Sequence, residues 1–147
     1  MSIRELQATD LARVIEIEHR CHSHPAAESI IAQSLSGQDL TYGIELDNTI
    51  VGFYLASVVL DELTVTDIAV IPEAQGNGFG RKLLTHLLDH AEQNGVKHLF
   101  LEVRASNVSA QGLYLSEGFN QLGVRKNYYP AAEGREDALV MGLSLAM

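Results

Sequence analysis

The sequence predicts an α/β (α+β) protein with a mixed, mostly antiparallel central sheet of about seven strands and helices on both faces. Short apolar segments alternate with amphipathic helical segments along the chain. Between residues 63 and 103, a strand, a glycine-rich loop, a helix and a second strand follow one another, which is the order of a parallel crossover unit. Elsewhere, Asp47 and Asn48 form a two-residue turn between consecutive strands, which makes those strands antiparallel.

Length and composition indicate one globular domain. The chain has 147 residues, of which 46% are hydrophobic and 20% charged. A chain of this length usually forms one domain with a core that needs no disulfides, so we expect residues 1–147 to form a single domain. A single cysteine excludes an internal disulfide and a zinc module built from several cysteines, and a reducing, cytoplasmic location is expected.

Charge and hydropathy exclude further classes of protein. The formal net charge is −9, whereas sequence-independent nucleic-acid binding requires a basic surface, so no direct nucleic-acid partner is expected. The longest apolar stretches, such as residues 50–60, are interrupted by Gly and Ser and are shorter than the roughly 18–20 residues of a membrane span. The first residues contain no apolar signal region, so neither secretion nor a membrane partner is predicted.

The first half of the chain is predicted to hold four strands and two helices. Thr9 and Asp10 offer an N-cap to the first helix, and Gly37 ends a second helix over residues 28–35. Pro72 ends the fourth strand because proline cannot donate to a ladder. The apolar stripe of the first helix continues into a carboxylate and consists of Leu11, Val14, Ile15 and Glu18. The strands are expected at residues 2–6, 40–46, 50–60 and 63–70.

The second half is predicted to hold two helices and three strands. A strongly periodic helix begins after residue 80 and ends before Gly95. The strand at residues 96–103 is almost continuously apolar, which predicts burial on both of its faces. A short helix begins at a cap, Ser106 or Asn107, and ends at Gly118. The last two strands are expected at residues 121–129 and 138–145.

The glycine-rich loop between a strand and a helix is the feature that first indicates chemistry. It reads Gln75-Gly76-Asn77-Gly78-Phe79-Gly80, and Arg81 and Lys82 begin the following helix. Small residues let backbone N–H groups approach a phosphate, and the helix N-terminus adds positive potential. A nucleoside-triphosphate loop needs Gly-Lys-Ser/Thr, and a dinucleotide loop follows the first strand, so neither fits. The loop therefore predicts either an anionic, phosphate-bearing ligand or a tight turn whose glycines serve packing.

The spacing Q-x-x-G-x-G, at Gln75, Gly78 and Gly80, resembles the acetyl-CoA pyrophosphate loop of the GNAT superfamily of N-acetyltransferases. The resemblance covers nearly the whole chain, is strongest from residue 59 onward, and implies the GNAT fold. Within that superfamily the chain looks like the bacterial ribosomal-protein-alanine N-acetyltransferases. The segments that carry the resemblance are residues 59–62, 101–107, 110, 113–114, 118–119, 127–130 and 134–138.

The resemblance implies acetyl-CoA as co-substrate, no metal, and direct acetyl transfer to the N-terminal alanine of a small-subunit ribosomal protein. Glu102 matches the general base of the family and Tyr114 matches its general acid. Asn107 matches an asparagine that contacts acetyl-CoA. The strand that presents backbone groups to acetyl-CoA matches Ile68, Ala69 and Val70, and the pyrophosphate loop matches Gln75, Gly76, Asn77, Gly78, Phe79, Gly80 and Arg81.

Elementary acid–base chemistry fits these roles. A tyrosine of pKa ~10 can protonate a thiolate whose thiol has pKa ~8.5. Burial of Glu102 in its apolar strand would raise the pKa of this carboxyl and make it a better base. Backbone N–H groups near Ala69 or Val70 can hold the developing oxyanion. The alternative readings are a solvated Glu102, or one paired with a neighbour such as Arg104, and a Tyr114 that only fills the core.

Two alternative functions remain open. The protein could acetylate another amine, such as a lysine side chain, a polyamine or a drug, or it could be a non-catalytic acyl-CoA-binding module. Residues 24–27 lack the aromatic side chains usual for the family, which leaves the acceptor less defined than the cofactor. No metal site is predicted, because the spacing of the four potential ligands near the end of the first helix matches no zinc finger. The four potential ligands are His19, Cys21, His22 and His24.

Overall fold

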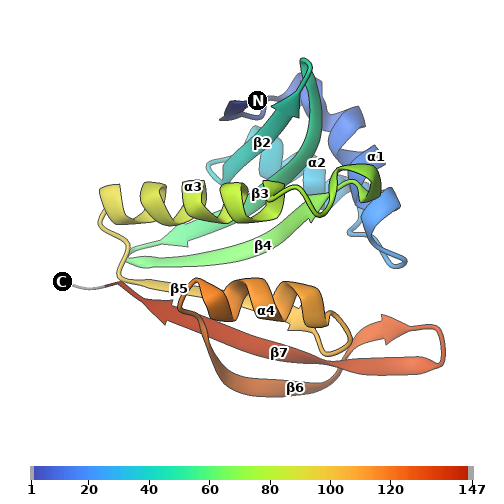
Figure 1. Ribbon diagram of the computed structural model, residues 1–147, viewed down its shortest axis with the longest axis vertical. Helices are drawn as coiled ribbons and strands as arrows, with labels where there is room; N and C mark the ends of the chain where they lie inside the picture. The colour runs from blue at the N-terminus through green and yellow to red at the C-terminus, as the bar shows by residue number, and fades with distance from the viewer. Residues whose placement is uncertain (1, 146–147) are drawn as a thin grey trace.

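A seven-stranded sheet runs through residues 2–145, the part of the chain that the structure, a computed structural model, describes. The strands are β1 (Ser2–Glu5), β2 (Leu40–Leu46), β3 (Thr49–Val59), β4 (Glu62–Val70), β5 (His98–Arg104), β6 (Asn120–Ala131) and β7 (Gly134–Ser144). They lie in the order β1-β2-β3-β4-β5-β7-β6 (Figure 1). Only β4 and β5 pair in parallel, which confirms the predicted mixed, mostly antiparallel sheet. The predicted domain also includes Met1 and residues 146–147, which lie outside the described residues.

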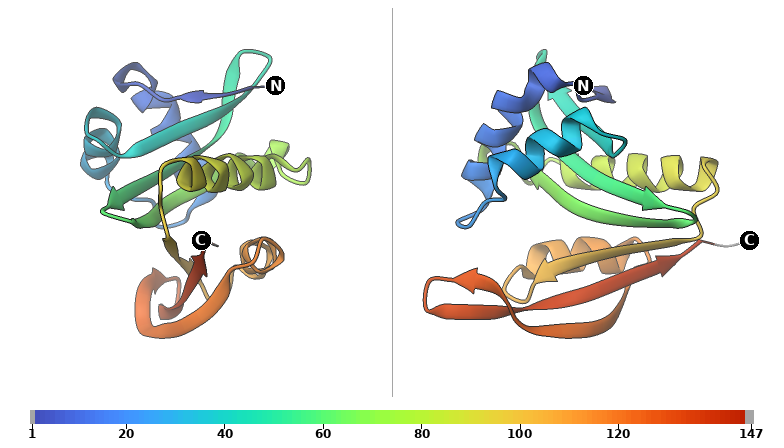
Figure 2. Two further views of the ribbon diagram at one scale, coloured as in Figure 1. Left: turned by 90° about the vertical axis from the view of Figure 1, so that its left-hand side faces the viewer. Right: turned by 180° about the vertical axis from the view of Figure 1, so that it is seen from behind.

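Helices cover both faces of this sheet, as predicted. They are α1 (Leu11–Cys21), α2 (Glu28–Ser36), α3 (Phe79–Gln93) and α4 (Val108–Ser116), with short 3-10 turns at Ala8–Asp10 and Pro72–Ala74. Figure 2 shows α1 and α2 on one face and α3 and α4 on the other. α3 connects β4 to β5 and is therefore the crossover helix of the parallel pair. Ile17 of α1, Phe53 of β3 and Leu83 of α3 are fully buried in the core between these layers. Among residues 2–145, no helix is long and apolar enough to cross a membrane.

Of two local predictions in the first half of the chain, a hairpin turn and a helix cap, the structure confirms the turn in full and the cap only in part. Asp47 and Asn48 have φ angles of 53° and 64°, the left-handed pair of a tight hairpin turn, and the predicted turn between β2 and β3 is confirmed. Asp10 is the N-cap residue of α1, as predicted for Thr9 and Asp10, but its side chain makes no capping hydrogen bond to that helix. That carboxylate accepts a hydrogen bond from Gln7 N at 2.8 Å and pairs with Arg4 at 2.9 Å. It thus fixes the 3-10 turn that precedes α1.

The prediction that β5 is buried on both faces is wrong. Leu99, Leu101 and Val103 are buried, whereas Phe100 and Glu102 between them are partly exposed. Continuous burial is typical of a strand inside a wholly parallel sheet. β5 is parallel to β4 but antiparallel to β7, so its side chains alternate as they do in an antiparallel sheet.

The parallel pair separates partway along its length. The ladder between β4 and β5 ends where Val65 lies opposite Leu101. At this point Thr66 is an extra residue in the pairing of β4 with β3, and its hydroxyl donates to Leu55 O at 3.0 Å. Such a bulge bends a strand, and it leaves the second halves of β4 and β5 on either side of the candidate site.

Candidate active site

A cavity of about 510 Å³, called the loop cavity below, lies between the glycine-rich loop, the end of β4 and α4. The rest of its wall comes from α4 and consists of Ser109, Ala110, Leu113 and Tyr114. Most of the residues predicted to contact acetyl-CoA therefore come together around one cavity. Those that line it are Ile68, Ala69, Val70, Gln75, Gly76, Gly78, Phe79, Gly80 and Arg81.

The N-terminus of α3 supplies backbone donors to the loop cavity. Gly78 is the N-cap, its carbonyl accepts from Lys82 N at 3.0 Å, and the first N–H groups of the helix have no partner within it. The first turn contains no acidic residue that would compete for an anion. Gly76 and Gly78 both have a φ of 81°, and a Cβ added at either would meet no atom within 4 Å. These glycines therefore set the backbone conformation and leave the loop open to a ligand.

Side chains of the loop are used to hold it in place. Asn77 donates from Nδ2 to Ala74 O at 3.1 Å and does not line the loop cavity, although it was predicted to contact the cofactor. Arg81 lines the cavity, and its guanidinium binds Ser116 at 3.1 Å and Glu117 at 3.2 Å at the end of α4. The backbone of the loop is thus more open to a phosphate than these two side chains are.

A second cavity, of about 290 Å³ and called the strand cavity below, lies between the separated halves of β4 and β5. Ile68 and Tyr114 line both cavities, and Glu102 lines the strand cavity. The two predicted catalytic residues therefore share one cavity, and one of them also borders the cavity with the glycine-rich loop.

Tyr114 is a buried neutral phenol at this junction. It is 5% exposed, and its ring packs against Phe119 with centroids 5.9 Å apart. Burial, reinforced by the negative charge of Asp67 and by Tyr129, raises the pKa of Tyr114 above its usual value near 10. The hydroxyl thus keeps its proton at physiological pH and can act as a donor.

Glu102 is less buried than the sequence predicted. Its side chain is 27% exposed, and its carboxylate pairs with Arg125 Nε of β6 at 3.2 Å. The alternative partner named from sequence, Arg104, pairs instead with Glu136 at 2.9 Å. The reason is the alternating burial of β5, which turns Glu102 toward the strand cavity and the β6–β7 hairpin.

Asn107 lies directly before α4, beside the strand cavity. Its Oδ1 accepts from Ala110 N at 3.2 Å and caps α4, as the sequence predicted. Its side chain lines the strand cavity and not the loop cavity. Contact with acetyl-CoA at Asn107 therefore stays a prediction.

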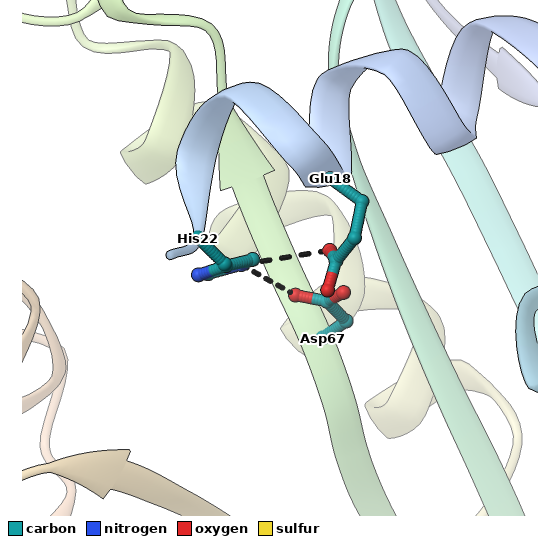
Figure 3. Close-up of side chains that lie close together, drawn as sticks. All are labelled: Glu18, His22 and Asp67. Carbon is teal, nitrogen blue, oxygen red and sulfur yellow. Dashed lines mark hydrogen bonds and ion pairs between the residues drawn. The ribbon is translucent and has the colours of Figure 1, made fainter. Parts of the chain in front are cut away.

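Sequence reasoning missed a group of ionisable residues in the strand cavity. Glu18 of α1, His22 directly after that helix and Asp67 of β4 point toward one another (Figure 3). Burial and the neighbouring Asp67 raise the pKa of Glu18 to about 8, and the contact with Asp67 raises the pKa of His22. One signal was available, because Glu18 interrupts the apolar stripe of its helix. A carboxylate on a buried face is uncommon without a partner or a function.

The class of protein follows from the sequence together with this fold. The sequence profile of the Acetyltransferase (GNAT) family matches residues 6–119, and the chain belongs to this family.

Within that family its relatives are ribosomal-protein-modifying enzymes. The chain is 44% identical to the ribosomal protein bS18-alanine N-acetyltransferase of Escherichia coli K12 over 99% of each chain. It is 41% identical to the protein of that name from Haemophilus influenzae, over 97% of this chain and 98% of the relative. The crystal structure of the Escherichia coli ribosomal-protein-S18-alanine N-acetyltransferase superimposes with a TM-score of 0.95, covering 99% of this chain and 94% of that chain. The fold is shared more widely, as with Arabidopsis thaliana NAA60 in complex with acetyl-CoA, at a TM-score of 0.88 and 16% identity over 98% of each chain.

Proposed function

We propose that the protein transfers the acetyl group of acetyl-CoA directly to the N-terminal alanine of a small-subunit ribosomal protein, in the cytoplasm. The observation that carries this proposal is the junction of the two cavities at Tyr114. The loop cavity offers a glycine-rich backbone and a helix N-terminus to a pyrophosphate, and the strand cavity offers Glu102 to an amine. The names of the relatives support the same acceptor.

Each side chain has a defined task in this reaction. Glu102, directly or through a water, takes a proton from the acceptor ammonium, so that the nitrogen lone pair can attack the thioester carbonyl. Backbone N–H groups near Ala69 or Val70 hold the negative charge that develops on the carbonyl oxygen. As the carbon–sulfur bond breaks, Tyr114 donates its proton to the departing sulfur, and the second proton that the nitrogen must lose restores the Tyr114 hydroxyl, directly or through a water. The products are the acetylated amine and free coenzyme A.

The acid–base properties of the acceptor favour an α-amine. At pH 7.5 roughly a third of an α-amino group of pKa ~7.7–8.0 is already neutral, against about a thousandth of a lysine of pKa ~10.4. An N-terminal amine therefore needs only a weak general base. A partly exposed, ion-paired Glu102 suits that modest demand better than it suits a lysine side chain.

Gly80→Val is expected to weaken acetyl-CoA binding while leaving the protein folded. Gly80 lies in the first turn of α3 and lines the loop cavity, and a Cβ there would make only ordinary contact with Leu113 at 3.6 Å. Gly78 is a less clean target because its φ of 81° strains any side chain. At a ligand concentration of about 100 Kd, acetyl-CoA should stabilise the parent by about 2.7 kcal/mol, or roughly 5–10 °C in Tm.

In Gly80→Val this ligand-induced shift should fall to a small fraction of that of the parent. Gly112→Val in α4 is the matched control, because Gly112 is exposed and lines neither cavity. Thermal denaturation with and without acetyl-CoA measures both variants. A full shift in Gly80→Val would place the cofactor elsewhere.

The acceptor is expected to be a peptide that begins with a free alanine. The test uses acetyl-CoA with two matched peptides that begin with alanine. The first has a free N-terminus, and the second has a blocked N-terminus and an internal lysine. Mass spectrometry should find the acetyl group on the α-amine, at a rate at least about tenfold above that for the lysine. Faster modification of the blocked peptide, or of spermidine included as a third acceptor, would transfer the proposal to another amine. No product from any acceptor, with acetyl-CoA bound, would favour a binding module.

A further inference from the structure

The strand cavity contains three side chains, those of Glu18, His22 and Asp67, whose potential metal-ligating atoms lie close together. His22 Nε2 lies 3.5 Å from Glu18 Oε1 and 3.3 Å from Asp67 Oδ1. The donor atoms of the three residues all lie within 4.8 Å of one another (Figure 3). A single ring nitrogen carries at most one proton, so it can donate to only one of the two carboxylates.

Glu18 shows that something is missing from this arrangement. It is 3% exposed, and its Oε2 accepts a hydrogen bond from Ala26 N at 2.9 Å. Its Oε1 is buried and accepts no hydrogen bond from any residue between 2 and 145. A buried carboxyl oxygen that accepts no hydrogen bond disfavours the ionised form of Glu18, and this oxygen lies 3.5 Å from His22 Nε2, on the side of the cluster and not of the apolar core.

We propose that Glu18, His22 and Asp67 form a binding site for a divalent cation of the zinc class. Imidazole nitrogen and carboxylate oxygen are zinc ligands, with bonds of about 2.0–2.2 Å. In a tetrahedron the distance between two ligand atoms is about 1.6 times the bond, or roughly 3.3–3.6 Å. The separations of 3.5 Å and 3.3 Å from His22 Nε2 to the two carboxylates match this edge length. The ion would provide the partner that Glu18 Oε1 lacks.

No spacing motif in the sequence could reveal this site. His22 is its only member from the run of potential ligands between residues 19 and 24. The thiol of Cys21 in that run donates to Val70 O at 3.2 Å instead. The other carboxylate, Asp67, comes from β4, 45 residues further along the chain. Only the packing of α1 against β4 brings these ligands together.

Three protein ligands leave one position of a tetrahedral ion open. The site lines the strand cavity together with Glu102 and Tyr114, so the open position faces the space proposed for the acceptor amine. A bound ion would repel an ammonium and would coordinate a neutral amine. Zn²⁺ is therefore an inhibitor that competes with the acceptor and not with acetyl-CoA, a consequence that rests on the proposed function.

Metal binding is tested first, independently of activity. Equilibrium dialysis of the full chain without a polyhistidine tag, with Zn²⁺ as the probe, should show one ion bound per chain. His22→Gln and Asp67→Asn should each lower the affinity at least about tenfold. His19→Gln changes an exposed histidine of α1, three residues before His22, and should leave the affinity unchanged. Co²⁺ in place of Zn²⁺ should give the visible absorption of a tetrahedral ion in the parent only.

These outcomes decide the proposal whether or not the protein acetylates anything. The partly exposed positions of His22 and Asp67 keep the test valid even if a substitution at the buried Glu18 fails to fold, and circular dichroism checks each variant. Absence of a stoichiometric ion, or equal losses in His22→Gln and His19→Gln, would overturn the site. Initial rates at several acceptor concentrations then test the competition. Binding with no effect on rate would leave the metal site standing and would remove only its link to the acceptor.

Discussion

Glu102→Gln is expected to reduce kcat about 10²–10⁴-fold at neutral pH, the usual loss when a general base is removed. The amide keeps the shape and hydrogen-bonding capacity of the side chain, but it cannot accept a proton from the attacking ammonium. The loss should shrink as the pH rises through ~7.7–8.0, because solvent then deprotonates the α-amine itself. Initial rates with both substrates saturating, measured across this pH range, test the expectation.

The ion pair between Glu102 and Arg125 is a competing explanation for a loss of rate in Glu102→Gln. A further variant separates this anchoring role from the role of general base. If Glu102 only anchors the β6–β7 hairpin, Arg125→Gln should be as damaging as Glu102→Gln, and neither loss should depend on pH. If Glu102 is the base, Arg125→Gln should retain most of the activity. Glu62→Gln, an exposed glutamate in β4, controls for the loss of a surface charge. A folded Glu102→Gln enzyme within about threefold of the parent rate would exclude the general-base role.

Much of the fold could be predicted from the sequence because local interactions specify it. The turn at Asp47 and Asn48 needs two left-handed residues, and Gly95, with a φ of 76°, ends α3 for the same kind of reason. The parts that failed depend on contacts that the local pattern does not specify. β5 is apolar along its length, but the identity of its partner β7 decides how its faces are buried. Asp10 was available as a cap, but Arg4 and Gln7 bind its carboxylate.

The candidate site also has one part that could be predicted from the sequence and one part that could not. The loop from Gln75 to Gly80 is contiguous in sequence, so its open backbone beside a helix N-terminus could be predicted from the pattern of glycines. The strand cavity is formed by α1, β4, β5 and the β6–β7 hairpin, and no sequence spacing relates its residues. Glu18 and Asp67 become neighbours only because the bulged β4 packs beside α1. Acceptor recognition is therefore the part of the function that needed the structure.

Tyr114→Phe is expected to lower kcat by about 10²–10⁴-fold with little change in the affinity for acetyl-CoA. The substitution removes one hydroxyl and almost no volume from a residue that is 5% exposed and packed on Phe119. The raised pKa of Tyr114 means that the hydroxyl of the parent stays protonated from about pH 6 to 9, so deprotonation of this residue should not reduce the parent rate there.

The defect of Tyr114→Phe should persist at high pH, in contrast to that of Glu102→Gln, because a more basic solution cannot supply the missing acid. Tyr128→Phe is the matched control, since Tyr128 is 41% exposed on β6 and lines neither cavity. The pH–rate series for both tyrosine variants, with acetyl-CoA binding measured by thermal shift, distinguishes an acid from a residue that only packs. Recovery of Tyr114→Phe at high pH, or a loss confined to cofactor affinity, would show that Tyr114 shapes the junction of the cavities and that the sulfur takes its proton from solvent.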